Sequence, residues 1–165
     1  MADLNHFRAT AVLRAENFER ARKFYTEVLG LDQEEPGFVA AALTPGPLES
    51  PKMEAGPARE GRFYAGHGTE VSIYERPGVP APQSTALAFE VPIDELGGIV
   101  EQLRSKGVVF QDYDMPEIGL KTVNGIAEVE GSKAAWFKDT EGNIIGLGSS
   151  EAGFDRRGRA LPLLQ

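Results

Sequence analysis

The order of predicted elements in this chain occurs twice. A strand, a helix and three further strands are predicted in the first half, and the same series follows in the second half. Each predicted helix is followed by a glycine, Gly30 and Gly107, and these two residues lie 77 positions apart. Glycine is the usual residue where a chain leaves a helix in the left-handed conformation. A repeat of this length indicates a duplicated supersecondary unit, in which neither copy buries its sheet alone.

The first repeat begins at residues 8–14, a partly alternating segment that is typical of a strand. A helix is predicted after the N-cap residue Asn17, because the apolar side chains from Phe18 to Leu29 fall on one helical face. The prolines and glycines of residues 44–61 predict a surface loop. Three further strands are predicted at residues 38–43, 62–65 and 70–75, the last two joined by Gly66-His67-Gly68.

The second repeat starts with a strand at residues 85–91. A helix follows from residue 93 to 103, with Asp94 and Glu95 in its first turn, where carboxylates favour the helix dipole. Residues 117–131 separate two of the later strands and are interpreted as either a lid or a plain surface loop. Those later strands are predicted at residues 108–113, 133–138 and 143–147, with a tight turn at 139–142.

The elements predict an α+β fold, in which two tandem βαβββ modules form one cup-shaped domain with mixed sheets. The modules span residues 7–76 and 84–150, and residues 151–165 form a tail that either frays or reaches a partner subunit. One face of each sheet is expected under its helix, and the other faces are expected to enclose the cup. A cup lined by strands is a natural site for a small molecule.

Three segments resemble motifs of one protein superfamily. The helix Phe18-Glu-Arg-Ala-Arg-Lys-Phe-Tyr-Thr-Glu-Val-Leu-Gly-Leu31 and the strand Ala88-Phe-Glu-Val91 are similar to segments of vicinal oxygen chelate proteins. The hairpin Trp136-Phe-Lys-Asp-Thr-Glu-Gly-Asn143 resembles a motif of the same proteins, with Thr140 where proline is usual. These proteins include glyoxalases, bleomycin-resistance proteins and ring-cleaving dioxygenases. The motifs occur in the right order in both repeats, so the chain is identified as a member of this superfamily.

The resemblance implies a place for a divalent metal ion, which superfamily members hold with two residues from each module. The corresponding positions here are Thr10 and Ser72 in the first module, and Ala86 and Gly146 in the second. Alanine and glycine have no side-chain donor atom, and hydroxyls bind transition metals weakly. Glu70, two residues from Ser72, adds at most one carboxylate to this face. We therefore expect a member without metal or other cofactor.

Several polar residues are candidates for contact with a ligand in the cup. Glu70, Ser72 and Tyr74 alternate along one strand and should share a face. They form either a stripe that orients a ligand or a hydrogen-bonded cluster that fills the cup. Arg14 lies either at the mouth of the cup or simply in solvent. His67 is either a histidine at the tip of a turn or, with Glu70, a candidate general base.

The aromatic residues are the second group of candidates. Tyr64 and Trp136 lie on predicted strands, where aromatic side chains belong to the core by default. Trp136 and Phe137 must point to opposite faces, because side chains alternate along a strand. One of this pair should therefore reach the cup.

Composition limits the partners and the compartment. The net charge of -8 disfavours nucleic acid as a partner. The chain has no cysteine, which excludes thiolate chemistry and fits a reducing cytoplasm. The N-terminal residues lack the pattern of a signal peptide, and no apolar run is long enough to span a membrane. We expect a cytoplasmic protein with a small-molecule partner, acting as a homodimer by analogy with the superfamily.

These observations leave three functions open. The first is metal-independent binding of a small molecule, of the drug-sequestering or bleomycin-resistance type. The alternative is a metal-free lyase, isomerase or epimerase that uses Glu70 or His67 as its base. The third is a metal-dependent dioxygenase or glyoxalase, which the four positions named above disfavour.

Overall fold

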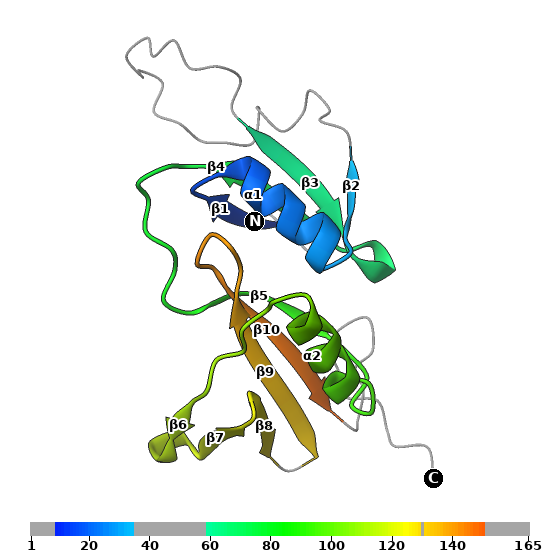
Figure 1. The fold of residues 1–165 in the computed structure, drawn as a ribbon, viewed down its shortest axis with the longest axis vertical. Helices are drawn as coiled ribbons and strands as arrows, with labels where there is room; N and C mark the ends of the chain where they lie inside the picture. Colours follow the sequence, from blue (N-terminus) through cyan, green and yellow to red (C-terminus); the bar gives the residue numbers. More distant parts are fainter. Residues whose placement is uncertain (1–8, 35–58, 130, 151–165) are drawn as a thin grey trace, which may run out of the picture. The chain divides into compact units, whose positions relative to one another are not determined.

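The computed structural model describes residues 9–34, 59–129 and 131–150, which group into two compact units divided between Ala81 and Pro82. Each unit contains one mixed sheet, of four strands in the first and six in the second, so the α+β class is confirmed (Figure 1). No helix of the described segments has the length and apolar character needed to cross a bilayer. The prediction that both modules form one domain with a cup between them stays a prediction.

The first unit follows the predicted order of elements. Its sheet has the strand order β1-β4-β3-β2, with β1 parallel to β4 and the other pairs antiparallel. The elements are β1 (Ala11–Ala15), α1 (Phe18–Lys23), a π-helical turn η1 (Phe24–Val28), β2 (Asp32–Glu34), β3 (Glu60–Tyr64), a 3-10 turn η3 (Gly66–Gly68) and β4 (Glu70–Glu75).

The helix of the first unit begins and ends where the sequence predicts. The side chain of Asn17 accepts a hydrogen bond from the backbone N–H of Arg20 at 2.9 Å, which satisfies one free donor of the first turn. The last turn widens into the π-helix, where the N–H of Leu29 donates to the carbonyl of Phe24 at 3.0 Å. Gly30 then takes a φ of 74°, a left-handed conformation that favours glycine.

The core of the first unit lies between this helix and the sheet (Figure 1). Its centre is aromatic, since the rings of Tyr25 and Phe63 have centroids 5.7 Å apart and both residues are fully buried. Gly61 is needed under Phe18, because a Cβ atom at residue 61 would lie 2.8 Å from the Phe18 ring. The remaining core residues are Leu13, Ala15, Ala21, Phe24, Val71 and Ile73.

The first unit also departs from the sequence prediction in places. The strand predicted at residues 8–14 begins only at Ala11, so Thr10 lies just before it. The short strand β2 was not predicted, while the strand predicted at residues 38–43 falls outside the described residues. Glu60 and Gly61, predicted in the loop, begin β3.

The second unit has the strand order β5-β10-β9-β8-β7-β6, with β5 parallel to β10. The helix packs its buried residues Leu96, Val100 and Leu103 on the face of the sheet that carries Phe137, Ile145 and Leu147. The elements are β5 (Thr85–Glu90), α2 (Leu96–Ser105), β6 (Asp114–Met115), a 3-10 turn η4 (Pro116–Ile118), β7 (Leu120–Val123), β8 (Ile126–Val129), β9 (Ser132–Lys138) and β10 (Ile144–Ser150).

Two predictions for the second unit were wrong. Residues 117–131 are not a lid or a plain loop, because they contain the hairpin of β7 and β8, which extends the sheet. Its turn is Asn124-Gly125, with φ of 51° and 74°, which suits the twist of a two-residue hairpin. Residues 108–113 are not a strand. They make one β-bridge, which joins Phe110 to Phe137. On β9 this bridge follows Ala135, the last residue that pairs with β8.

Asp112 joins the hairpin to the segment that precedes it. Its Oδ1 accepts hydrogen bonds from Thr122 Oγ1 at 3.0 Å and from the backbone N–H of Gly125 at 2.9 Å. The Thr122 hydroxyl in turn accepts from the N–H of Tyr113 at 2.8 Å. These bonds satisfy backbone donors at the turn, which explains why residues 108–113 run beside the hairpin without forming a ladder.

Candidate ligand-binding faces

Each sheet has one face under its helix and one face that its helix leaves open. In the first unit the buried residues Leu13, Phe63, Val71 and Ile73 mark the helix side. Their strand neighbours must point the other way. We call the set on that side the first open face; it consists of Val12, Arg14, Arg62, Tyr64, Glu70, Ser72 and Tyr74.

Glu70 and Arg62 form an ion pair on the first open face. The Nε atom of Arg62 lies 3.6 Å from Oε1 of Glu70. The Glu70 side chain is only 7% exposed, against 26% for Arg62. A carboxylate removed from water in this way requires its counter-charge. Ser72 lies directly beside this pair, since its cross-strand partners are Arg62 on β3 and Val12 on β1.

Two other candidates lie on this face with partners of their own. Arg14 has a largely buried side chain, 12% exposed, and its Nη1 donates to Glu16 at 3.2 Å. The alternative that placed Arg14 simply in solvent is therefore wrong. Tyr74 carries the guanidinium of Arg76 over its ring, 5.9 Å from the centroid. His67 belongs to the 3-10 turn between β3 and β4.

The second unit also has an open face, and it is chemically different. Ala135, Phe137, Ile145 and Leu147 are buried on the helix side. The residues that alternate with them, Ala134 and Trp136 on β9 and Gly146 and Gly148 on β10, therefore point to the other side. Ala88 of β5 lies beside Gly146. We call this set of five residues the second open face.

The indole of Trp136 lies over Gly146. A Cβ atom at residue 146 would be 3.4 Å from Nε1 of Trp136, 3.4 Å from Cγ2 of Thr85 and 3.5 Å from Cβ of Ala88. Gly146 therefore has side chains on three sides at van der Waals distance. Tyr113 completes the surface, because its ring meets the Trp136 ring edge-on, at 85° and 5.6 Å between centroids.

Phe137 is fully buried and Trp136 is partly exposed, so the two side chains lie on opposite faces of β9, as alternation requires. That one of the pair reaches a cup stays a prediction. Sequence reasoning did not place Tyr113 or Thr85 at this surface. Tyr113 belongs to the segment mistaken for a strand, where an aromatic side chain is expected in the core by default. Thr85 is brought there by an irregularity in β5, where the register jumps from Thr85 to Leu87 and leaves Ala86 without a partner on β10.

The residues present do not fit a divalent metal ion. In the second unit, Gly146 and Ala86 offer no donor, and the indole covers the space over Gly146. In the first unit, Ser72 offers a hydroxyl, and the neighbouring carboxylate of Glu70 is paired with Arg62. No group of three or more His, Cys, Asp or Glu side chains able to hold a metal occurs in residues 9–34, 59–129 and 131–150.

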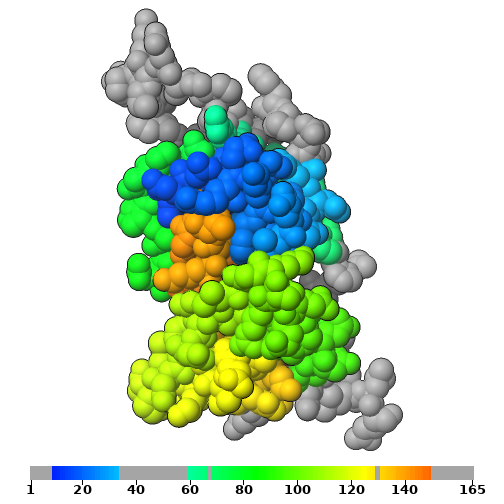
Figure 2. Space-filling model, viewed as in Figure 1, coloured from blue at the N-terminus to red at the C-terminus, as the bar shows by residue number. Residues whose placement is uncertain are grey.

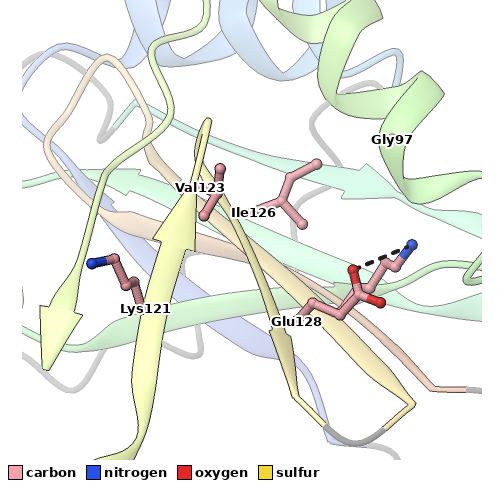
Figure 3. Close-up of a pocket in the computed structure, with 6 residues that line it drawn as sticks. Gly97, Lys121, Val123, Ile126 and Glu128 are labelled. Atoms are coloured by element: carbon pink, nitrogen blue, oxygen red, sulfur yellow. Dashed lines mark ion pairs between the residues drawn. The ribbon is translucent and has the colours of Figure 1, made fainter. Parts of the chain in front are cut away.

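A further hollow lies on the helix side of the second sheet, where α2 does not cover β7 and β8. It measures about 340 Å³ and is lined by Gly97, Lys121, Val123, Ile126, Glu128 and Lys133 (Figure 3). Two of its charged lining residues pair with each other, since Lys133 Nζ lies 3.8 Å from Glu128 Oε2. Lys121 pairs instead with Asp114, which does not line the hollow, at 3.2 Å between Nζ and Oδ2. The β7–β8 hairpin forms molecular surface beside α2 (Figure 2), and Val123 is 67% exposed there. Sequence reasoning missed this hollow together with the hairpin.

Comparison with known proteins gives one family and several solved structures of similar fold. The family model described as the glyoxalase/bleomycin resistance protein/dioxygenase superfamily matches residues 3–147. No curated protein matches the chain.

Among solved structures, the fosfomycin resistance protein FosX of Listeria monocytogenes has a TM-score of 0.60 at 13% identity, covering 88% of this chain and 91% of that one. A glyoxalase/dioxygenase from Nostoc punctiforme has a TM-score of 0.58 at 15% identity, with 91% and 95% covered. An integron cassette protein from the mobile metagenome of a Halifax Harbour sewage outfall has a TM-score of 0.53 at 17% identity, with 87% and 99% covered. At these identities the likeness concerns the fold alone.

Proposed function

The chain belongs to the glyoxalase/bleomycin resistance protein/dioxygenase superfamily, and we propose that it captures a planar, largely apolar small molecule without a metal ion. One observation supports this proposal most strongly. Gly146 occupies a position that the superfamily resemblance assigns to a metal ligand, and the indole of Trp136 lies over it. Aromatic rings bind other flat rings through dispersion and the removal of apolar area from water.

The second open face supports capture by its shape and chemistry. Trp136 and Tyr113 present two ring surfaces at 85° to each other. Gly146 and Gly148 keep the strand beside them free of side chains. Such a corner takes a flat ring against one aromatic face and the edge of that ring against the other. Trp136, Tyr113, Gly146 and Gly148 carry no formal charge, whereas Glu90 beside Gly148 and Lys138 on the Trp136 side of β9 bring charges to the same face. A ligand against the two rings is therefore held mainly by burial of apolar area.

Two measurements test capture together. Elemental analysis of the protein, purified without chelator, should find no stoichiometric manganese, iron, nickel or zinc. Denaturation should release a small organic molecule, detected by mass spectrometry, from wild-type protein and from Tyr64→Ala but not from Trp136→Ala. Tyr64 is the matched control because it is an aromatic residue on the other open face. One metal ion per chain, or equal release from both variants, would contradict the proposal.

A metal-free reaction with Glu70 as base is the second candidate function. The observation in its favour is the position of Glu70, which is almost buried beside Ser72 and held by Arg62. An ion-paired carboxylate in such a place accepts a proton from a bound substrate only if that substrate lies on the first open face. Glu70→Gln distinguishes the two functions, because it should abolish turnover of the captured molecule if Glu70 is the base and leave binding intact.

We also propose that the protein acts in the cytoplasm as a homodimer. The absence of cysteine from the sequence supports a reducing compartment. The dimer rests on analogy with the superfamily. Light scattering after size-exclusion chromatography tests it, and a mass of one chain at micromolar concentration would contradict it.

A further inference from the structure

We infer that the indole N–H of Trp136 is the hydrogen-bond donor that selects the ligand, which must therefore be a planar molecule with a neutral acceptor at the edge of its ring. This inference rests on the proposed function, because it specifies the chemistry of the molecule captured at the same face. It concerns the second unit alone.

The donor atom of Trp136 lies beside Gly146. Nε1 is the atom of Trp136 that approaches Gly146, at 3.4 Å from where a Cβ atom would be. Because Gly146 alternates with the buried residues Ile145 and Leu147, that Cβ position lies on the open side of the sheet. The polar edge of the indole is thus turned toward Gly146 on β10.

The hydrogen bonding of this N–H decides which group a ligand must supply. An indole has one N–H group and no acceptor, so it forms its hydrogen bond only as a donor. Among residues 9–34, 59–129 and 131–150, the structure gives this N–H no acceptor. Ala88 and Gly146 beside it have no polar side-chain atom, whereas the hydroxyl-bearing Thr85 borders the same spot through its methyl group. A ligand that covers the N–H without an acceptor leaves the donor unsatisfied, which costs binding free energy.

Glycine at residue 146 leaves room for the indole of Trp136. Gly146 has no positive φ, so its backbone conformation does not require glycine. An alanine Cβ would make ordinary van der Waals contacts with three side chains, and a larger residue would press on the indole. Gly148, two residues further along the same strand and on the same face, has nothing within 4 Å of a Cβ atom. A large side chain at residue 146 would therefore disturb the pose of Trp136, whereas the space over Gly148 is open.

The experiment compares quinoline, which has an acceptor nitrogen at its ring edge, with naphthalene, which has the same shape and no acceptor. Trp136 is the chain's single tryptophan, so one indole N–H resonance reports the donor directly. Wild-type protein should bind quinoline roughly fivefold more tightly than naphthalene, the ratio typical of one neutral hydrogen bond. Quinoline should also move the indole resonance in the direction of a stronger hydrogen bond.

The variants separate the donor from the ring. Trp136→Phe keeps an aromatic ring without the N–H, so quinoline and naphthalene should bind it equally. Gly146→Val should remove the preference by displacing the indole. Affinities in the variants are measured by calorimetry, with thermal melts as the check of folding. If Gly146→Val fails to fold, Trp136→Phe still decides the question.

The failures are distinguishable. Equal binding of quinoline and naphthalene to wild type, with the indole resonance unmoved by quinoline, would overturn this inference and leave capture in place. A preference for quinoline that survives in Trp136→Phe would also overturn it, since another donor would then be responsible. Binding of neither compound to the wild-type protein would overturn the proposed capture on this face as well.

Discussion

Arg62 and Glu70 lie on neighbouring antiparallel strands, with the guanidinium Nε 3.6 Å from the carboxylate Oε1. They are not directly opposed, because the register pairs Arg62 with Ser72 and Tyr64 with Glu70. The pair is thus a diagonal contact across β3 and β4, a separation that long side chains span. Sequence analysis named Glu70 as a candidate residue on this face, but it did not name Arg62.

The first prediction concerns this ion pair. Arg62→Met should lower the free energy of unfolding by about 2 kcal/mol, because it removes a cationic partner of a nearly buried carboxylate. Arg59→Met, at an exposed arginine just before β3, is the control and should change stability by less than about 0.5 kcal/mol. Urea denaturation measures both. In the Arg62→Met background, Glu70→Gln should restore part of the loss; a further loss of the same size as in wild type would show that the two residues do not interact.

The second prediction concerns the turn of the β7–β8 hairpin. Gly125 has a φ of 74°, and a Cβ atom there would lie 2.8 Å from Cβ of Phe110. Gly125→Ala should therefore cost about 3 kcal/mol, from left-handed strain and overpacking together. Gly119 has a similar φ of 69° with open space around it, so Gly119→Ala should cost only about 1 kcal/mol. Equal losses in thermal or chemical unfolding would mean that Phe110 does not pack on the turn.

The third prediction concerns the helix α2. Gly98 is an exposed residue of this helix with nothing within 4 Å of a Cβ atom, so Gly98→Ala should stabilise the protein by about 1 kcal/mol. Gly107, just beyond the same helix, has a φ of 90°, and Gly107→Ala should destabilise it by about 1 kcal/mol. The difference in melting temperature between the two variants is the measurement. A loss in both would indicate that Gly98 is constrained by something other than helix propensity.

The repeated order of elements was predictable because it depends on short-range chemistry. Asn17 caps its helix as its side chain dictates, and Gly30 and Gly107 take the left-handed conformation that ends each helix. The alternation of Val71 and Ile73 with polar neighbours correctly assigned the two faces of β4. In each case the signal lies within a few residues of the feature.

The errors occur where distant segments decide the outcome. Asn124-Gly125 is itself a strong hairpin signal, but the three glycines of residues 117–131 suggested a loop. The strand β2 has only three residues, all polar, and exists because β3 pairs with it. Trp136 could be placed on the open face by alternation, whereas its approach to Gly146 depends on the register of β9 with β10, which no local pattern specifies.

The central claim is that the second open face binds a planar molecule with its own side chains and no metal ion. The dissociation constant of quinoline, measured by calorimetry in EDTA and again in the presence of Mn(II), tests it most directly. We predict the same dissociation constant in both conditions, and its increase in Trp136→Phe in both. Binding that is lost in EDTA and restored by Mn(II) would contradict the account, because a metal ion would then be part of the site.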